Sequence, residues 1–237
     1  MTNCEIAATP MNVNEKLQRD DGTGHANGKL HMSLVGGLNY LTHTRPDIAF
    51  PVSVVSRYMH NPTKQHLGAA KRILRYVAGT MRYGVWYTRV AEPKLVGFTD
   101  SDYAGCLDDR KSTSDNVFSL GSGAVTWSSK KQETIALSSS EAAYVASSSA
   151  VRQALWLKKL LGDFLVKHDK ATILYCDNQS AIAIAKNQAF HGRTKHIDVQ
   201  HHFIRKIKAD GKVILKFCVT NDQVADVFPS ISSLCLS

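Results

Sequence analysis

The fold of this chain is organised around one stretch, which reads Gly97-Phe98-Thr99-Asp100-Ser101-Asp102-Tyr103-Ala104-Gly105. Just before it, Pro93 punctuates the chain, and the apolar residues Leu95 and Val96 predict a short strand over residues 94–98. Asp100 follows this strand, and a glycine-bounded turn comes next. A strand that carries an aspartate at its own end holds a metal ligand rigidly, although an aspartate in this position is more often a turn former or a helix cap.

The same pattern recurs later in the chain. Residues 172–176 predict a second apolar strand, which is followed by Asp177 and then by Asn178. Ligands in α/β sheets bind outside the carboxyl ends of the strands. The recurrence therefore favours a shared site over two unrelated turns.

The composition of the 237 residues is that of a globular basic protein, with 43% hydrophobic residues and a net charge of +9 from 29 basic and 20 acidic residues. This balance favours a polyanionic partner, with nucleic acid ahead of a membrane surface; a basic protein without such a partner is the alternative.

The five cysteines form no CxxC pair, which argues against a zinc knuckle and fits a reducing compartment. Neither a signal peptide nor a run of membrane-spanning length is present in the sequence.

We expect two regions that meet near residues 92–93. Residues 1–30 are polar and rich in Gly, Asn and Asp, and we expect them to be loose. Residues 33–41, 45–59 and 64–77 then predict short helices, which makes the first region mainly helical.

The second region alternates between strands and helices. The first predicted strand is the one that leads to Asp100. The others span residues 116–120, 124–128, 172–176 and 212–219. The predicted helices of this region span 139–161, 179–185, a segment ending near 210, and 221–228. Strands and helices mixed in this way predict an α/β layer fold with ligands near the strand ends.

Four acids stand out by position: Asp100 and Asp177 at strand ends, Glu141 in the first turn of the long helix, and Asp226 in the final helix. If they converge, they repel each other unless cations bind among them, and hard oxygen ligands favour Mg²⁺ or Mn²⁺. Two such ions catalyse the in-line displacement of a phosphodiester. A basic protein with such a cluster is typical of a nuclease.

Each of these acids also has a structural interpretation. Glu141 stands three residues after Ser138, which is the spacing of a capping box. Asp177 or Asn178 is suited to cap the helix that follows, and Asp226 is suited to be a surface acid favoured by a helix dipole. Only the combination of the four supports a metal site.

The ordered motifs resemble the C-terminal part of a copia-type LTR retrotransposon Pol polyprotein. The resemblance to the tail of its reverse transcriptase rests on residues 35–42 (VGGLNYLT), 45–50 (RPDIAF) and 70–76 (AKRILRY). The resemblance to its ribonuclease H domain rests on residues 99–105, 109–114, 127–132 (WSSKKQ), 136–142 (ALSSSEA), 176–181 (CDNQSA), 193–198 (RTKHID) and 224–226.

The resemblance implies a ribonuclease H-like mixed sheet of order βββαβαβα at residues 93–237, preceded at 1–92 by a small, mainly helical remnant of the reverse transcriptase. It implies endonucleolytic cleavage of the RNA strand of RNA–DNA hybrids, with two Mg²⁺ or Mn²⁺ ions as cofactors. The four acids above would be the catalytic, metal-binding residues, with Asp100 preferred over Asp102.

The resemblance also implies nucleic-acid contacts and partners. The candidate contact residues are Ser101, Lys130, Lys131, Asn178, Gln179 and Lys195. The expected partners are the RNA–DNA hybrid and the rest of the polyprotein, and no membrane. We expect a cytoplasmic location, with a virus-like particle or the nucleus as alternatives, and no secretion.

The chain departs from the family pattern at three places. Asp115 stands where the family usually has Gly, Ala143 where a second Glu is frequent, and the segment after Asp226 lacks the usual residues. The altered tail, together with the missing polymerase core, favours an alternative, a decayed fragment that at most binds nucleic acid. An RxLR tetrapeptide at 72–75 suggests an effector-like protein, a remote alternative. A zinc site among the histidines at 196, 201 and 202 is disfavoured.

Overall fold

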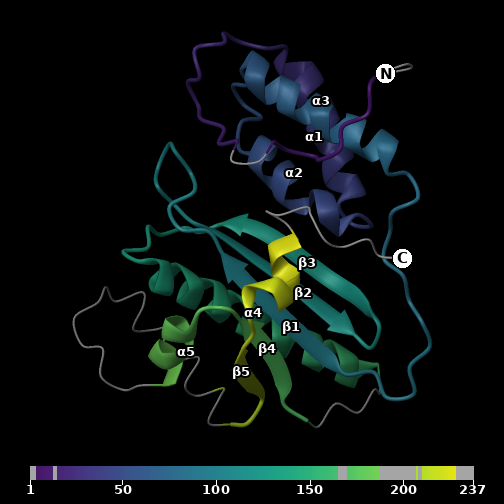
Figure 1. The fold of residues 1–237 in the computed structure, drawn as a ribbon, viewed down its shortest axis with the longest axis vertical. Helices are drawn as coiled ribbons and strands as arrows, with labels where there is room; N and C mark the ends of the chain where they lie inside the picture. Colours follow the sequence, from purple (N-terminus) through teal and green to yellow (C-terminus); the bar gives the residue numbers. More distant parts are fainter. Residues whose placement is uncertain (1–3, 13–14, 165–169, 187–206, 208–209, 228–237) are drawn as a thin grey trace. The chain divides into compact units, whose positions relative to one another are not determined.

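The computed structural model describes residues 4–12, 15–164, 170–186, 207 and 210–227. These residues form two compact units (Figure 1). The helical unit comprises the described residues up to Trp86 together with the loop Gly105–Arg110, and the sheet unit comprises Tyr87–Ala104 and Lys111–Asp226. None of the helices in the described residues has the length and hydropathy of a membrane span.

The helical unit contains α1 (Gly28–Leu41), the 3₁₀ turn η1 (Pro46–Ile48), α2 (Ala49–Ser56) and α3 (Lys64–Gly79). The first helix begins earlier than the expected start at Ser33. Its cap is Asn27, whose side-chain oxygen accepts a hydrogen bond from the N–H of Leu30. The third helix begins where the sequence predicts, because Thr63 caps it.

The segment before α1 is packed, which differs from the loose segment expected over residues 1–30. Leu17 is only 3% exposed and belongs to the core of the helical unit. Asp21 accepts a hydrogen bond from the Thr63 hydroxyl, and His66 bonds the carbonyl of Gln18 at 3.0 Å. These polar contacts attach an irregular segment to the start of α3.

The sheet unit is built on five strands: β1 (Leu95–Ser101), β2 (Thr113–Leu120), β3 (Gly123–Lys131), β4 (Thr172–Cys176) and β5 (Val213–Phe217). Their order across the sheet is β3-β2-β1-β4-β5. The first three strands are antiparallel neighbours, whereas β4 runs parallel to both β1 and β5. This mixed sheet confirms the predicted ribonuclease H-like α/β fold.

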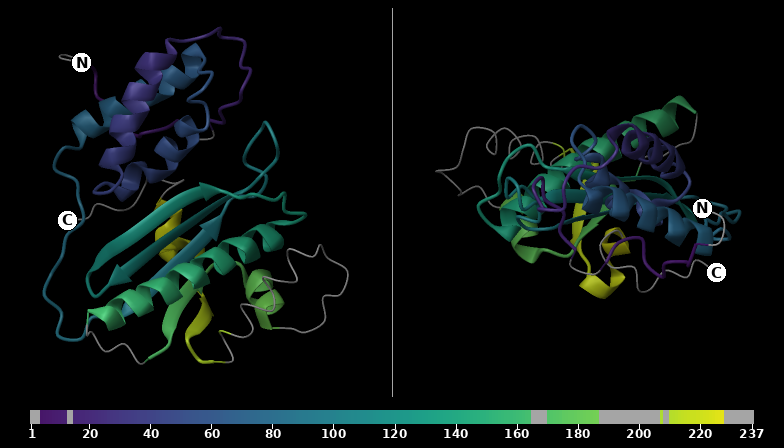
Figure 2. Two further views of the ribbon diagram at one scale, coloured as in Figure 1. Left: turned by 180° about the vertical axis from the view of Figure 1, so that it is seen from behind. Right: turned by 90° about the horizontal axis from the view of Figure 1, so that it is seen from above.

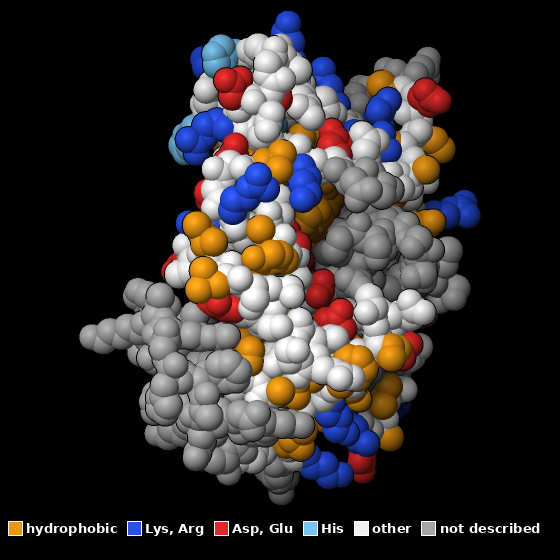
Figure 3. All heavy atoms as spheres, turned by 60° about the vertical axis from the view of Figure 1, so that its left-hand side comes forward, with side chains coloured by type: hydrophobic (Ala, Val, Ile, Leu, Met, Phe, Trp, Pro, Cys, Tyr) orange, Lys and Arg blue, Asp and Glu red, His pale blue; other side chains and the backbone are white. Residues whose placement is uncertain are grey.

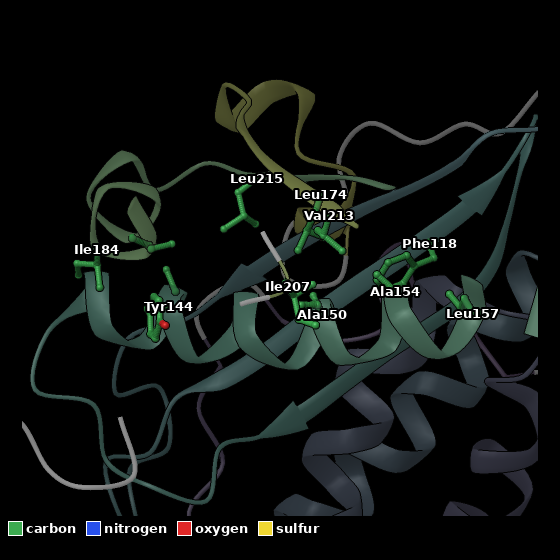
Figure 4. Close-up of a cluster of buried hydrophobic side chains, with 14 of the residues drawn as sticks. Phe118, Tyr144, Ala150, Ala154, Leu157, Leu174, Ile184, Ile207, Val213 and Leu215 are labelled. Atoms are coloured by element: carbon green, nitrogen blue, oxygen red, sulfur yellow. The ribbon is translucent and has the colours of Figure 1, made fainter. Parts of the chain in front are cut away.

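One long helix, α4 (Ser139–Asp163), crosses a face of the sheet and covers its core (Figure 2). Phe118, Tyr144 and Leu174 are fully buried between helix and sheet (Figure 4). A side chain at Gly97 would not fit there, because its Cβ would lie 2.5 Å from a ring carbon of Phe118. The short helix α5 (Gln179–Lys186) follows β4 and contributes to the same core.

The end of the described chain differs from the helix expected over residues 221–228. It forms two 3₁₀ turns, η2 (Thr220–Asp222) and η3 (Val224–Val227). Gln223 interrupts the helix, because its backbone is extended and its buried side chain bonds elsewhere. The predicted helix that ends near residue 210 lies almost entirely outside the described residues.

Candidate active site

Asp100 and Asp177 come from the same edge of the sheet. In the parallel pair β1 and β4, Thr99 lies opposite Cys176. Asp100 and Asp177 are the next residues along these two strands, and both side chains are partly exposed. Because parallel strands end on the same side, the two carboxylates occupy neighbouring positions at the carboxyl edge.

The electrostatics of the site agree with this register. Burial raises the pKa of Asp177 above its ordinary value of 3.8, and the negative charge of Asp100 raises it further. A hydrogen bond from the Thr220 side chain acts in the opposite direction. The two carboxylates are therefore close enough to disfavour each other's charge, which is the situation that a bound cation relieves.

Glu141 is brought to the start of α4 and is 3% exposed. The Oγ of Ser138 accepts a hydrogen bond from the N–H of Glu141 at 3.2 Å, and the N–H of Leu137 donates to Oε2 of Glu141 at 3.1 Å. Ser138 and Glu141 therefore both cap α4, although Glu141 does so through Leu137 and not through the N–H of Ser138. An ionised carboxylate has about four acceptor sites, so this cap leaves capacity for a metal.

Asp102, two residues after Asp100, forms hydrogen bonds to Thr113 at the start of β2. Its carboxylate accepts a hydrogen bond from the N–H of Thr113 at 2.5 Å, and its own N–H donates to the Thr113 carbonyl at 3.2 Å. Asp102 therefore joins the end of β1 to the start of β2. Asp100 remains the candidate ligand at the strand end.

The fourth candidate, Asp226, has its backbone in η3. Gln223 attaches the segment before it to β1, since its Nε2 donates to the carbonyl of Thr99 at 3.0 Å. The N–H of Ala225 bonds back to Oε1 of Gln223 at 3.3 Å. A buried glutamine thus ties the C-terminal turn to the residue directly before Asp100.

The predicted nucleic-acid contacts fall at different places. Ser101 is the last residue of β1, and its buried Oγ has no hydrogen-bond partner among the described residues. The side-chain oxygen of Asn178 accepts from the N–H of Ala181 at 2.9 Å, so Asn178 caps α5. Gln179 is exposed at the start of α5, and Lys195 lies outside the described residues.

Lys130 and Lys131 are the last two residues of β3, with Lys130 exposed and Lys131 half-buried. Lysine and arginine side chains form several separate groups on the face shown in Figure 3. The expectation that these two lysines contact phosphates rests on their position at the end of β3.

Two residues near the acids had been assigned no role. Asp115 is 1% exposed and lies directly opposite Asp100 in the β1–β2 pair, so both side chains lie on the same face of the sheet. Gln132 follows β3 and bonds both β2 and α4. Strand register would have revealed Asp115, whereas Gln132 stands out in the sequence only as the last residue of the motif at 127–132, which indicates no role for it. Ala143, where the family frequently has Glu, is buried in the core.

The described residues offer a divalent cation two carboxylates at the carboxyl edge of the sheet. Asp100 and Asp177 provide hard oxygen ligands, and their mutual repulsion favours a cation between them. Among the described side chains, no group of three or more His, Cys, Asp or Glu is placed to hold a metal ion. The described residues thus supply a carboxylate pair that fits Mg²⁺ or Mn²⁺. The side chain of Asp226 lies outside the part of the chain that the structure describes.

No protein-family model matches the chain. The retrovirus-related Pol polyprotein from transposon TNT 1-94 of Nicotiana tabacum is 39% identical over 238 residues, which cover 98% of this chain and 18% of that protein. The polyprotein from transposon RE1 of Arabidopsis thaliana is 37% identical over 226 residues, or 95% of this chain and 15% of that protein. The chain therefore spans less than a fifth of these relatives.

Other similarities are more local or more distant. Secreted RxLR effector protein 161 of Plasmopara viticola is 47% identical over 128 residues, which cover 54% of this chain and 90% of that protein. The foamy viral protease-reverse transcriptase dRH in complex with double-stranded DNA aligns with 81% of this chain and 32% of its own, at 14% identity and a TM-score of 0.55. The foamy viral protease-reverse transcriptase in complex with an RNA/DNA hybrid aligns with 87% of this chain and 26% of its own, at 13% identity and a TM-score of 0.51.

At these identities, the likeness to the foamy viral structures concerns the fold alone. The sequence relatives show more than the fold, because the two plant transposon polyproteins align with 98% and 95% of the chain at 39% and 37% identity. The chain belongs to the family of retrovirus-related Pol polyproteins of transposons.

Proposed function

We propose that the sheet unit of this chain is the ribonuclease H part of a retrotransposon Pol polyprotein and that it hydrolyses the RNA strand of RNA–DNA hybrids endonucleolytically. The observation that carries the proposal is the pair Asp100 and Asp177, which repel each other at the carboxyl edge of a ribonuclease H-like sheet. Family membership supports the same conclusion.

Asp100, Glu141, Asp177 and Asp226 would hold two Mg²⁺ or Mn²⁺ ions. Two such ions, when bound, stabilise the attacking and leaving oxygens of a phosphodiester displacement. The chain's contribution is rigid placement: Asp100 lies near the end of β1, Asp177 directly follows β4, and Glu141 is fixed at a capped helix start. Little reorganisation is then needed when substrate binds.

RNA would be distinguished from DNA by its 2′-hydroxyl groups, which line the shallow minor groove of a hybrid. Exposed Gln179 and the amide nitrogen of Asn178 are suited to such contacts. Ser101 lies beside Asp100, and its Oγ is buried, so its contact with RNA would require the hydroxyl to become exposed. Lys130, Lys131 and Lys195 are suited to phosphate contacts, which position the duplex without reading its sequence.

We assign the helical unit to the remnant of the reverse transcriptase. The matches to the two plant polyproteins continue through this unit and support the assignment. The expected partner is accordingly the rest of the polyprotein, in addition to the hybrid.

A decayed fragment that only binds nucleic acid is the second candidate. Asp115, which replaces the usual Gly, favours it because it places a further buried carboxylate beside Asp100. The effector-like alternative has weaker support: the tetrapeptide at 72–75 lies within α3, where Ile73 is 1% exposed and belongs to the core. A short linear motif read by another protein would need to be accessible.

The proposal is tested with four labelled substrates of one sequence: an RNA–DNA hybrid, double-stranded RNA, double-stranded DNA and single-stranded RNA. The purified chain should cleave only the RNA of the hybrid, in the presence of Mg²⁺ or Mn²⁺, and should stop when EDTA is added. Binding of the hybrid without cleavage in either metal would favour the decayed fragment.

A further inference from the structure

We propose that Gln132 is the positioning residue for Glu141, an inference that rests on the proposed function. Gln132 is 6% exposed and lies in the loop between β3 and α4. Its Nε2 donates to the Oγ of Ser114 at 2.8 Å and to the carbonyl of Ala142 at 3.0 Å. Its backbone N–H donates to the carbonyl of Ser112 at 2.8 Å.

These bonds join the two segments that carry the candidate ligands. Ala142 is the residue after Glu141, whereas Ser114 lies opposite Ser101, the residue after Asp100. The Gln132 amide therefore links Ala142, which follows Glu141, to Ser114 on β2. Ser114 is paired with Ser101, which follows Asp100. The two donors of one planar NH₂ group fix the distance between α4 and β2 at the site.

The loop that begins at Gln132 is held at its other end by the cap of α4. There, Leu137 and Ser138 bond the carboxylate and the N–H of Glu141. Glu141 thus has a fixed backbone on its C-terminal side, through Gln132, and a fixed side chain on its N-terminal side, through the cap. Residues that orient a metal ligand in this way change metal affinity or activity when they are replaced.

The chemistry of Gln132 favours positioning over simple packing. Its Oε1 is buried and has no hydrogen-bond partner among the described residues. Burying an amide with an unsatisfied acceptor is unfavourable, and an apolar side chain of similar length would fill the same space without that cost. Met has a similar length and could fill the same space, but it lacks the two N–H donors through which Gln132 bonds Ser114 and Ala142.

The test compares Gln132→Met with a matched control, Gln153→Met, a half-buried glutamine of α4. Three quantities are measured: hydrogen exchange of residues 133–143 in the metal-free chain, the Mn²⁺ concentration at half-saturation by calorimetry, and the separate kcat and KM for the hybrid. Ser114→Ala is a milder second variant, which removes one of the two bonds and guards against misfolding of the first.

In Gln132→Met we expect faster exchange in residues 133–143, weaker Mn²⁺ binding and a kcat lowered by about 10- to 100-fold. The KM for the hybrid should stay within about twofold. Ser114→Ala should show smaller changes in the same direction, and the control should match the wild type. A purely structural glutamine would lower thermal stability without moving the Mn²⁺ midpoint.

Unchanged exchange, or an unchanged Mn²⁺ midpoint in both variants, overturns the proposal. If the wild-type chain binds Mn²⁺ but cleaves no hybrid, the proposed function fails, and the exchange and Mn²⁺ data alone then decide the role of Gln132. A wild-type chain that binds no Mn²⁺ overturns both.

Discussion

Replacement of Asp177 by Asn should stabilise the metal-free chain. Burial and the charge of Asp100 both raise the pKa of Asp177, so its ionised form is disfavoured in the folded state. Asparagine keeps the shape of the side chain and removes the charge. The gain comes from removing a charge that is partly buried and repelled by Asp100, and not from any new contact.

The magnitude follows from the strand register. Asp100 and Asp177 follow Thr99 and Cys176, which are paired in parallel strands about 4.8 Å apart. At roughly 5 Å, two unit charges repel by about 1 kcal/mol in water and by about 3 kcal/mol at an effective dielectric constant of about 20. Both side chains are partly exposed, so we expect the lower value. It corresponds to a rise in Tm of about 2 to 4 °C.

The pH dependence has a definite sign. Because the folded chain binds the proton of Asp177 more tightly than the unfolded chain, stability falls as pH rises from the ordinary value of 3.8 through the raised pKa. The penalty is complete once the pH lies above the raised pKa. Below 3.8 both states are protonated, and Asp177→Asn should have the stability of the wild type.

The assay is thermal unfolding in EDTA at neutral and at acidic pH, repeated with Mn²⁺. Asp163→Asn, at the far end of α4, is the control. Mn²⁺ should stabilise the wild type and the control but not Asp177→Asn, which has lost a ligand. The reasoning is refuted if Asp177→Asn lowers Tm in EDTA at neutral pH, or if Mn²⁺ stabilises it as much as the wild type.

Three further outcomes are expected. Gly97→Ala should cost about 1 to 3 kcal/mol in denaturant unfolding, because the added Cβ meets Phe118, and no loss would contradict the packing. Gln223→Met should lower kcat by about 10- to 100-fold by releasing the C-terminal turn from Thr99, and an unchanged kcat would argue against this role. Lys130→Ala should raise KM and reduce the salt slope of hybrid binding by about 1, whereas an unchanged slope would mean that Lys130 contacts no phosphate.

Much of the sheet unit could be predicted because its signals are local. The strand that carries Asp100 near its end and the strand that precedes Asp177 are short apolar runs bounded by turn residues. β4 has the bounds that the sequence predicts, whereas β1 continues to Ser101. The long helix begins at its predicted cap, Ser138. These features depend on neighbours in sequence, which composition and spacing report directly.

The features that the sequence did not predict depend on contacts between residues that are far apart in the chain. The start of α1 was misplaced because Asn27 and Ser33 are both residue types that cap helices, and the helix begins at the earlier of the two. The last helix was wrong because Gln223 bonds the carbonyl of Thr99, far away in sequence. Asp115 and Gln132 gain their positions through strand register and a loop contact, which one sequence does not reveal.

The most direct test of the site compares Asp100→Asn with Asp102→Asn in cleavage of a hybrid with labelled RNA. The two acids lie two residues apart, but Asp102 bonds the N–H of Thr113 whereas Asp100 faces Asp177 across the strand ends. Asp100→Asn should remain folded and lose more than about 100-fold in kcat, beyond the loss expected for an outer-shell residue. Asp102→Asn should lower Tm and keep most of its kcat. Wild-type cleavage by folded Asp100→Asn would contradict the account.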